Sequence, residues 1–134
     1  MTHLDGAVRG TPLLILKAEG LALLGLATWA FTLTGHSWWL YGALFLAPDL
    51  SFAAYVAGPR AGAIIYNAMH TTLAPALLAA IGLTTGSALA LAVAAIWAAH
   101  IGLDRALGFG LKYPSGFGDT HLGHVGRAAG RATQ

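Results

Sequence analysis

The stretch from Ser87 to Gly108 reads SALALAVAAIWAAHIGLDRALG and contains no ionisable side chain before His100. A helix rises about 1.5 Å per residue, so roughly 20 apolar residues cross the hydrocarbon core of a bilayer, which is about 30 Å thick. This stretch has that length, and its many alanines are small enough to let helices pack closely in lipid. It therefore predicts a transmembrane helix.

Three other apolar stretches of similar length precede it, and the four predicted spans cover residues 13–33, 38–57, 61–82 and 87–108. The composition agrees, because 57% of the 134 residues are hydrophobic and 9% are charged, against about 25% charged in a soluble domain. The links between the spans are short, which makes successive helices antiparallel neighbours. We expect one all-α membrane domain over residues 1–134, an antiparallel four-helix transmembrane bundle with a cytoplasmic C-terminal segment at 109–134.

The basic residues predict how the spans are oriented. Lysine and arginine occur before or at the start of the first span, between the second and third, and after the fourth, but not in the other two links. Because positively charged loops stay in the cytoplasm, we expect both termini there, in a multi-pass protein of the cell inner membrane. The net charge is only +2 and the basic residues are scattered, so we expect no nucleic-acid partner. The basic residues are Arg9, Lys17, Arg60, Arg105, Lys112, Arg127 and Arg131.

Polar residues of different spans fall at one depth, in the cytoplasmic half. Ionisable groups inside a membrane are costly unless they are paired or hydrated, so they normally face a bundle interior or a water-filled cavity. His100 and Asp104 are spaced i,i+4 and share one helix face, and Pro48, before Asp49, removes a backbone hydrogen bond within a span. We therefore expect a polar site formed by Glu19, Asp49, Asn67, His70, His100 and Asp104.

Each of these residues also has an interpretation without function. Lys17 and Glu19 are typical of interfacial anchors whose charged ends reach the membrane surface. Asp49 is able to pair with Arg60 or Arg105 as a purely structural contact. A lone His70 is more often a buried hydrogen-bonding residue than a ligand. The agreement in depth among several helices favours the site.

The segment after the fourth span reads GFGLKYPSGFGDTHLGH at 108–124 and is too apolar and aromatic for an ordinary disordered tail. Its glycines permit it to fold back under the bundle as a lid that carries Lys112, Asp119 and His121. The alternative is a tail that simply lies at the membrane surface. The chain contains no cysteine, which excludes disulfides and thiolate metal sites.

Histidine and carboxylate side chains are the usual ligands of zinc or non-haem iron. We expect a divalent metal on His70, His100, Asp104 and His121, in an enzyme whose catalytic group also includes Asp49. The same side chains suit acid–base catalysis without a metal. A substrate at this depth is expected to be a lipid-like or isoprenoid small molecule taken from the lipid bilayer. The expected ligand-binding residues are Glu19, Asn67, Arg105, Lys112, Tyr113 and Asp119.

Two functions without catalysis are open alternatives. His70 and His100, facing each other from the third and fourth spans, would suit axial ligation of haem. The polar layer would equally suit helix packing in an accessory or assembly subunit of a larger membrane complex, or in a homo-oligomer. A proton or ion carrier is less favoured, because the outer half contains no ionisable relay.

Several short motifs are similar to those of one known family. They are Glu19-Gly20, Trp38-Trp39-Leu40, Leu46-Ala47-Pro48-Asp49-Leu50-Ser51, Gly58-Pro59-Arg60, Tyr66-Asn67-x-x-His70, His100-Ile101-Gly102-Leu103-Asp104-Arg105, Gly108-Phe109-Gly110-Leu111-Lys112-Tyr113 and Asp119-Thr120-His121-Leu122-Gly123. Over residues 14–124, the chain resembles a bacterial family of small membrane proteins, the domain of unknown function DUF4260. The resemblance implies a four-helix integral membrane protein and brings no activity with it.

Overall fold

A computed structural model describes residues 6–125 of the protein; Arg127 and Arg131, which contributed to the predicted orientation, lie outside the described residues. Four helical segments are each long and apolar enough to cross a membrane. They are Gly10–Thr32, Trp38–Ala57, Pro59–Thr85 and Ala88–Leu107. The predicted all-α fold of a multi-pass membrane protein is therefore confirmed.

The second span changes its helical form partway. It begins as helix α2 (Trp38–Leu44) and continues as the 3-10 helix η1 (Ala47–Ala57). Pro48 occupies the first turn of η1, and proline has no N–H with which to continue the hydrogen bonding of a preceding α-helix. The change of helical form lies directly before Asp49, so the sequence break predicted at Pro48 helps to position that carboxylate.

The third span is also broken, which the sequence analysis did not predict. Helix α3 (Pro59–His70) ends at His70, and helix α4 (Leu73–Thr85) begins three residues later. Thr71, between them, is extended, with ψ 140°. Pro75 explains the break, because it cannot donate the hydrogen bond that an unbroken helix would direct to Thr71. His70 consequently lies at a helix end, and its free carbonyl accepts a hydrogen bond from Arg105 Nη2 at 3.0 Å.

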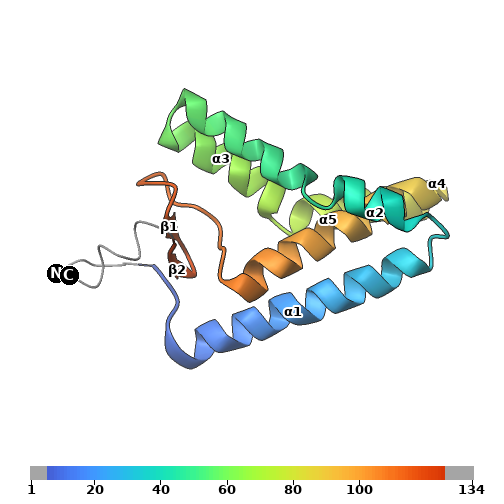
Figure 1. The fold of residues 1–134 in the computed structure, drawn as a ribbon, viewed down its shortest axis with the longest axis horizontal. Coiled ribbons are helices and arrows are strands. Elements are labelled where there is room, and N and C mark those ends of the chain that lie inside the picture. Colours follow the sequence, from blue (N-terminus) through green and yellow to red (C-terminus); the bar gives the residue numbers. More distant parts are fainter. Residues whose placement is uncertain (1–5, 126–134) are drawn as a thin grey trace.

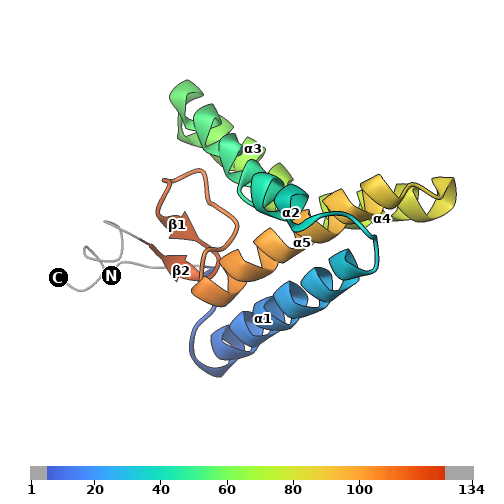
Figure 2. The same ribbon diagram turned by 45° about the vertical axis from the view of Figure 1, so that its right-hand side comes forward.

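The helices are arranged as a long pair and a diverging hairpin (Figures 1 and 2). Helix α1 (Gly10–Thr32) lies along α5 (Ala88–Leu107), and α4 packs on α5 as well. The hairpin of η1 and α3 turns at Gly58, whose φ of 110° suits glycine, and it points away from α1 (Figure 1). Helix α5 therefore connects the two parts.

The C-terminal segment, residues 109–125, folds back between the diverging hairpin and the α1–α5 pair (Figure 2). Its strands β1 (Asp119–Thr120) and β2 (Gly123–His124) pair antiparallel. Asn67 of α3 fixes the segment twice: the Lys112 N–H donates to Asn67 Oδ1 at 2.6 Å, and Asn67 Nδ2 donates to the Lys112 carbonyl at 2.8 Å. The amide of Asn67 thus mimics a neighbouring strand and holds Lys112 against the membrane helices.

Candidate metal centre

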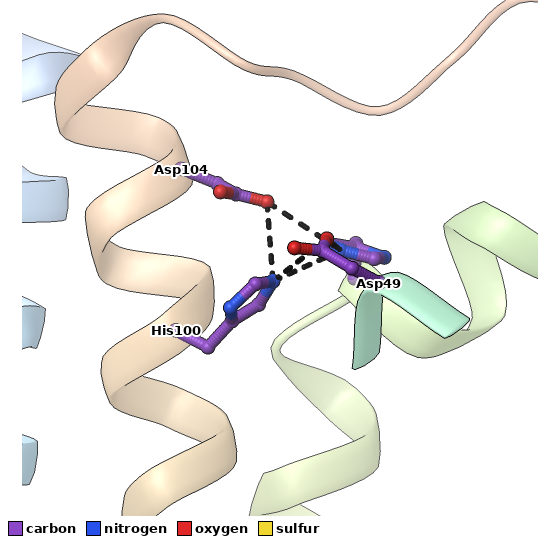
Figure 3. Close-up of side chains that lie close together, drawn as sticks. Asp49, His100 and Asp104 are labelled. Carbon is purple, nitrogen blue, oxygen red and sulfur yellow. Dashed lines mark hydrogen bonds and ion pairs between the residues drawn. The ribbon is translucent and has the colours of Figure 1, made fainter. Parts of the chain in front are cut away.

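Four side chains from three helices converge at one point in the structure. Asp49 comes from η1, His70 from the last residue of α3, and both His100 and Asp104 from α5. Figure 3 shows His100 and Asp104 projecting from α5 towards Asp49. One ligand atom from each of the four residues lies within 4.8 Å of the other three.

The spacing of these ligand atoms fits a single metal ion. His70 Nε2 lies 3.2 Å from His100 Nε2, 3.3 Å from Asp49 Oδ1 and 3.4 Å from Asp104 Oδ2. His100 Nε2 lies 3.2 Å from Asp49 Oδ1 and 3.5 Å from Asp104 Oδ2. A tetrahedron with corners about 2.0–2.1 Å from its centre, the usual distance from zinc to nitrogen or oxygen, has edges of about 3.3–3.4 Å. Five of the six distances therefore match the edges of such a tetrahedron, and the sixth, between the two carboxylate oxygens, is within 4.8 Å.

His70 is held in the tautomer that a metal ligand requires. Its Nδ1 lies 2.9 Å from the carbonyl oxygen of Tyr66, and a carbonyl only accepts, so Nδ1 carries the proton and Nε2 is left with a free lone pair. Histidine ligands of metals are usually oriented in this way by a hydrogen bond on the other ring nitrogen. Tyr66 also stacks on the His70 ring at 3.7 Å between centroids, and its hydroxyl donates to Asp104 Oδ2 at 3.5 Å.

The His100 ring is positioned by packing instead. It is 1% exposed, and its Nδ1 is buried without a hydrogen-bond partner among the described residues. The ring of Phe45 meets it edge to face, with centroids 5.6 Å apart. Nε2 is consequently the polar atom through which His100 contacts other groups of the cluster.

The two carboxylates face a cavity, whereas the two histidines lie behind them. The side chains of Asp49 and Asp104 are 31% and 14% exposed, while those of His70 and His100 are each 2% exposed. A cavity of about 300 Å³ adjoins the carboxylates and is otherwise mainly aromatic. Its lining residues are Asp49, Phe52, Tyr66, Asp104, Phe109, Lys112, Phe117 and Val125. A larger apolar groove between α1, α4 and α5 contains no ionisable side chain, so the polar chemistry belongs to the smaller cavity.

His121, predicted as a fourth metal ligand, lies in the C-terminal segment and is not part of the four-residue cluster. Its Nδ1 accepts a hydrogen bond from the Leu111 N–H at 2.9 Å. Burial, and next the positive charge of Arg105, lower the pKa of His121. The ring is therefore neutral at pH 7, and Asp49, not His121, is the fourth member of the cluster.

The other predicted ligand-binding residues divide between the cavity and the protein's own framework. Lys112 lines the cavity, and Asn67 holds its backbone. Arg105 donates to the carbonyls of His70 and Phe109. Glu19 is exposed on α1.

Tyr113 and Asp119 contact the terminal segments. The Tyr113 hydroxyl donates to the Gly6 carbonyl at 3.1 Å. Asp119 accepts from the Ser115 hydroxyl at 2.7 Å and lies 2.8 Å from His124 Nδ1. Both residues therefore stabilise the fold of the C-terminal segment.

Aromatic residues of the site were missed by the sequence analysis. Tyr66 lies one helical turn before His70, a spacing that places both on one face of α3. Phe52 stacks on Tyr66 at 5.3 Å and meets Phe117 at 5.3 Å between centroids. Tyr66 had a usable signal in its i,i+4 spacing to His70, whereas Phe117 comes from a segment whose path the sequence does not reveal.

Comparison with known families gives one match. The family described as Domain of unknown function (DUF4260) matches residues 13–125, which is most of the chain. No curated protein and no solved structure matches the chain. The matched region contains all four helices of transmembrane length except the first turn of α1, together with the whole His/Asp cluster. The chain therefore belongs to the DUF4260 family of domains of unknown function.

Proposed function

We propose that this membrane protein binds one divalent metal ion, zinc or non-haem iron, and uses it as a Lewis acid on a lipid-like or isoprenoid small molecule. The observation that carries the proposal is the convergence of Asp49, His70, His100 and Asp104, whose ligand atoms all lie within 4.8 Å of one another. Two imidazoles and two carboxylates are a ligand set that suits both metals. Asp49 replaces His121 in the set of ligands that the sequence predicted.

The charges of the cluster support a bound cation. The oxygens of Asp49 and Asp104 lie within 4.8 Å of each other, and both residues belong to segments of transmembrane length. Two carboxylates repel each other at this distance, and burial in a membrane makes the repulsion more costly. A divalent cation would offset both charges, and the free lone pair on His70 Nε2 is ready to bind it.

The position of the cavity supports catalysis rather than a purely structural ion. Four protein ligands are typical of structural zinc sites, so catalysis here requires the ion to accept a fifth ligand, as catalytic zinc does in some transition states. Here the carboxylate side adjoins a cavity of about 300 Å³. An ion held by these ligands would be approached from that side, where it would polarise a substrate oxygen or activate a water molecule.

The geometry does not support the alternative of a haem. Two histidines that ligate one haem iron lie on opposite faces of the porphyrin. His70 Nε2 and His100 Nε2 lie 3.2 Å apart, and the oxygens of Asp49 and Asp104 lie within 3.5 Å of them. Carboxylates therefore occupy the space in which a porphyrin ring would have to lie.

Elemental analysis of protein purified without a chelator or a nickel column tests the metal. We expect about one equivalent of a divalent transition metal per chain. Cobalt substitution then tests the geometry and the access of a fifth ligand. Co²⁺ should give the intense visible bands of a tetrahedral site, and azide should shift them as it adds from the cavity. Absence of any bound metal would contradict the proposal, and cobalt bands that ignore azide would contradict its catalytic part.

The orientation of the site in the membrane is a further part of the proposal. The basic residues before the first span, at Arg60 and after the fourth span favour a cytoplasmic location for that end of every helix, and thus for the metal centre. In a bacterial cell this corresponds to the inner membrane, with both termini in the cytoplasm.

Cysteine labelling tests this orientation, because the natural chain contains no cysteine. Ser37→Cys lies in the link between α1 and α2. We expect an impermeant maleimide to label it on spheroplasts, whose outer membrane has been removed and whose inner membrane is intact. Arg60→Cys lies at the opposite end of the helices and serves as the matched control, which should be labelled only after permeabilisation. The reverse pattern would place the metal centre on the outer side.

A further inference from the structure

Lys112 is a buried cation that the proposed metal chemistry leaves without a role. It is 4% exposed, although lysine is almost never fully buried unless it is paired. Among residues 6–125, no carboxylate forms an ion pair with its ammonium group. Its nitrogen instead lies 4.0 Å from the centroid of the Phe117 ring and 4.7 Å from that of Tyr66.

The backbone holds Lys112 in this position with several contacts. Asn67 bonds to both its N–H and its carbonyl, and Lys112 forms a strand-like bridge with Thr120. Such fixation means that the ammonium group is directed into the cavity by the fold. A lysine free to move would reach the nearby water of the membrane surface instead.

With the metal ion bound, the charged groups that line the cavity have a net positive charge and would attract a negative group. A divalent ion and Lys112 together carry three positive charges, and Asp49 and Asp104 carry two negative ones, which leaves one positive charge. Arg105 does not line the cavity, and its guanidinium donates to the carbonyls of His70 and Phe109. Its positive charge still acts on Asp104, so it adds to the attraction for an anion. Burial lowers the pKa of Lys112, while the charges of Asp104 and Asp49 raise it in part. A bound anion would also favour the charged ammonium.

Apart from the charged groups and the Tyr66 hydroxyl, the walls of the cavity are apolar. Phe52, Phe109 and Phe117 line it together with Val125. Its volume of about 300 Å³ is at the lower end of the range for small-molecule sites. A polar head with part of an apolar chain would fill it, and a large polar ligand would not.

We propose that this cavity binds a monoanionic oxyanion, such as a carboxylate or a phosphodiester, attached to an apolar chain, with Lys112 as its counter-charge. This inference rests on the proposed function, because the ion at Asp49 and Asp104 makes the cavity positive. It narrows the substrate class from a lipid-like molecule to an anionic amphiphile. Without the ion, the two carboxylates would outweigh Lys112 and repel such a ligand.

The test uses octanoate as the probe, titrated by calorimetry into zinc-loaded full-length protein in dodecyl maltoside, with a micelle blank. We expect Lys112→Met to weaken octanoate binding about 10-fold to 100-fold, the effect of losing a hydrogen bond to a charged group. Lys112→Arg should restore most of the affinity. Lys17→Met, which removes a lysine outside the cavity, is the matched control and should bind like the wild type. Chelated, metal-free protein should not bind octanoate.

Two further probes test separately whether the ligand needs its apolar chain and its negative charge. Acetate carries the same head without a chain; weaker binding than octanoate supports an amphiphile, and equal binding overturns the part of the proposal that requires a chain. Octyl glucoside has the chain without the charge, and binding as tight as that of octanoate, unaffected by Lys112→Met, would overturn the proposal.

The two proposals fail in distinguishable ways. Wild-type protein that retains its zinc but does not bind octanoate overturns the inference about Lys112 and leaves the metal site intact. Protein that binds no metal contradicts the metal site itself. Metal content measured in Lys112→Met and Lys112→Arg separates loss of the ligand from loss of the fold, because both variants should keep the wild-type amount.

Discussion

His100→Ala is expected to reduce bound zinc from about one equivalent to less than about a tenth under the same purification, whereas His121→Ala keeps it. His100 Nε2 lies within 3.5 Å of the ligand atoms of His70, Asp49 and Asp104. Its removal leaves three ligands and one open corner on a buried ion. Changes to groups that merely orient a metal ligand already cost about 10-fold to 100-fold in affinity, so the loss of a ligand should cost more.

The control His121→Ala distinguishes two sets of ligands. The cluster in the structure does not contain His121, whereas the set predicted from the sequence does. His121 is a histidine at the same end of the helices, yet it is outside the cluster and bonds to the Leu111 N–H. Equal loss of zinc in both variants would mean that His121 ligates the ion. Unchanged zinc in His100→Ala would mean that the metal binds elsewhere on the protein.

Asp49→Asn extends the series to the carboxylate that η1 contributes to the cluster. An asparagine keeps the shape of the side chain but loses the charge, so zinc affinity should fall while the helical content stays unchanged. Circular dichroism of every variant shows whether the helices remain folded, which prevents unfolding from being read as ligand loss.

Much of the fold and part of the site could be predicted from residue position alone. Helix rise converts position in a span into depth. Counting from the predicted cytoplasmic ends placed six polar residues in one layer: Glu19, Asp49, Asn67, His70, His100 and Asp104. The i,i+4 spacing then put His100 and Asp104 on one face of a helix. In the structure four of the six, Asp49, His70, His100 and Asp104, form the cluster, because a shared depth and burial in lipid leave ionisable groups few partners except one another. Glu19 is instead exposed on α1, and Asn67 bonds to Lys112.

The details that the sequence analysis missed depend on backbone breaks and on long-range packing. The third span was predicted as one helix, yet it breaks after His70. Pro75 offered a local signal for that break, since its missing N–H affects the carbonyl four residues earlier. No comparable signal existed for the path of residues 109–125, because Asn67 contacts Lys112 across 45 positions. Depth alone therefore could not separate His121 from the true cluster.

The two faces of α5 explain how the His/Asp cluster is supported from behind. Successive residues of a helix are about 100° apart, so Gly102 lies about 200° around the axis from His100 and faces away from the cluster. It packs against α1, where Gly20 lies opposite it. Neither glycine has a side chain to separate the two backbones, and close approach through small residues is how helices associate in lipid.

Gly102→Ala and Gly20→Ala are therefore expected to destabilise the protein strongly. A Cβ at Gly102 would lie 2.5 Å from the nitrogen of Leu24 and 2.7 Å from the Gly20 carbonyl oxygen. A Cβ at Gly20 would lie 2.7 Å from the nitrogen of Ala106. These are backbone atoms that no change of rotamer can move, so α1 and α5 must separate. Overpacking of this kind costs about 1–3 kcal/mol or more.

Gly25→Ala is the matched control, because it lies on the same helix α1 and its Cβ would meet nothing within 4 Å. Alanine is a better helix former than glycine by up to about 1 kcal/mol, so this variant should be as stable as the wild type or slightly more so. Unfolding in sodium dodecyl sulfate, followed by circular dichroism, measures the stability of all three variants.

Gly102→Ala and Gly20→Ala should also lose zinc, because α5 shifts and moves His100 and Asp104 away from His70. Gly25→Ala should keep its metal. Wild-type stability and zinc content in Gly102→Ala would show that α1 does not support the metal-binding face of α5.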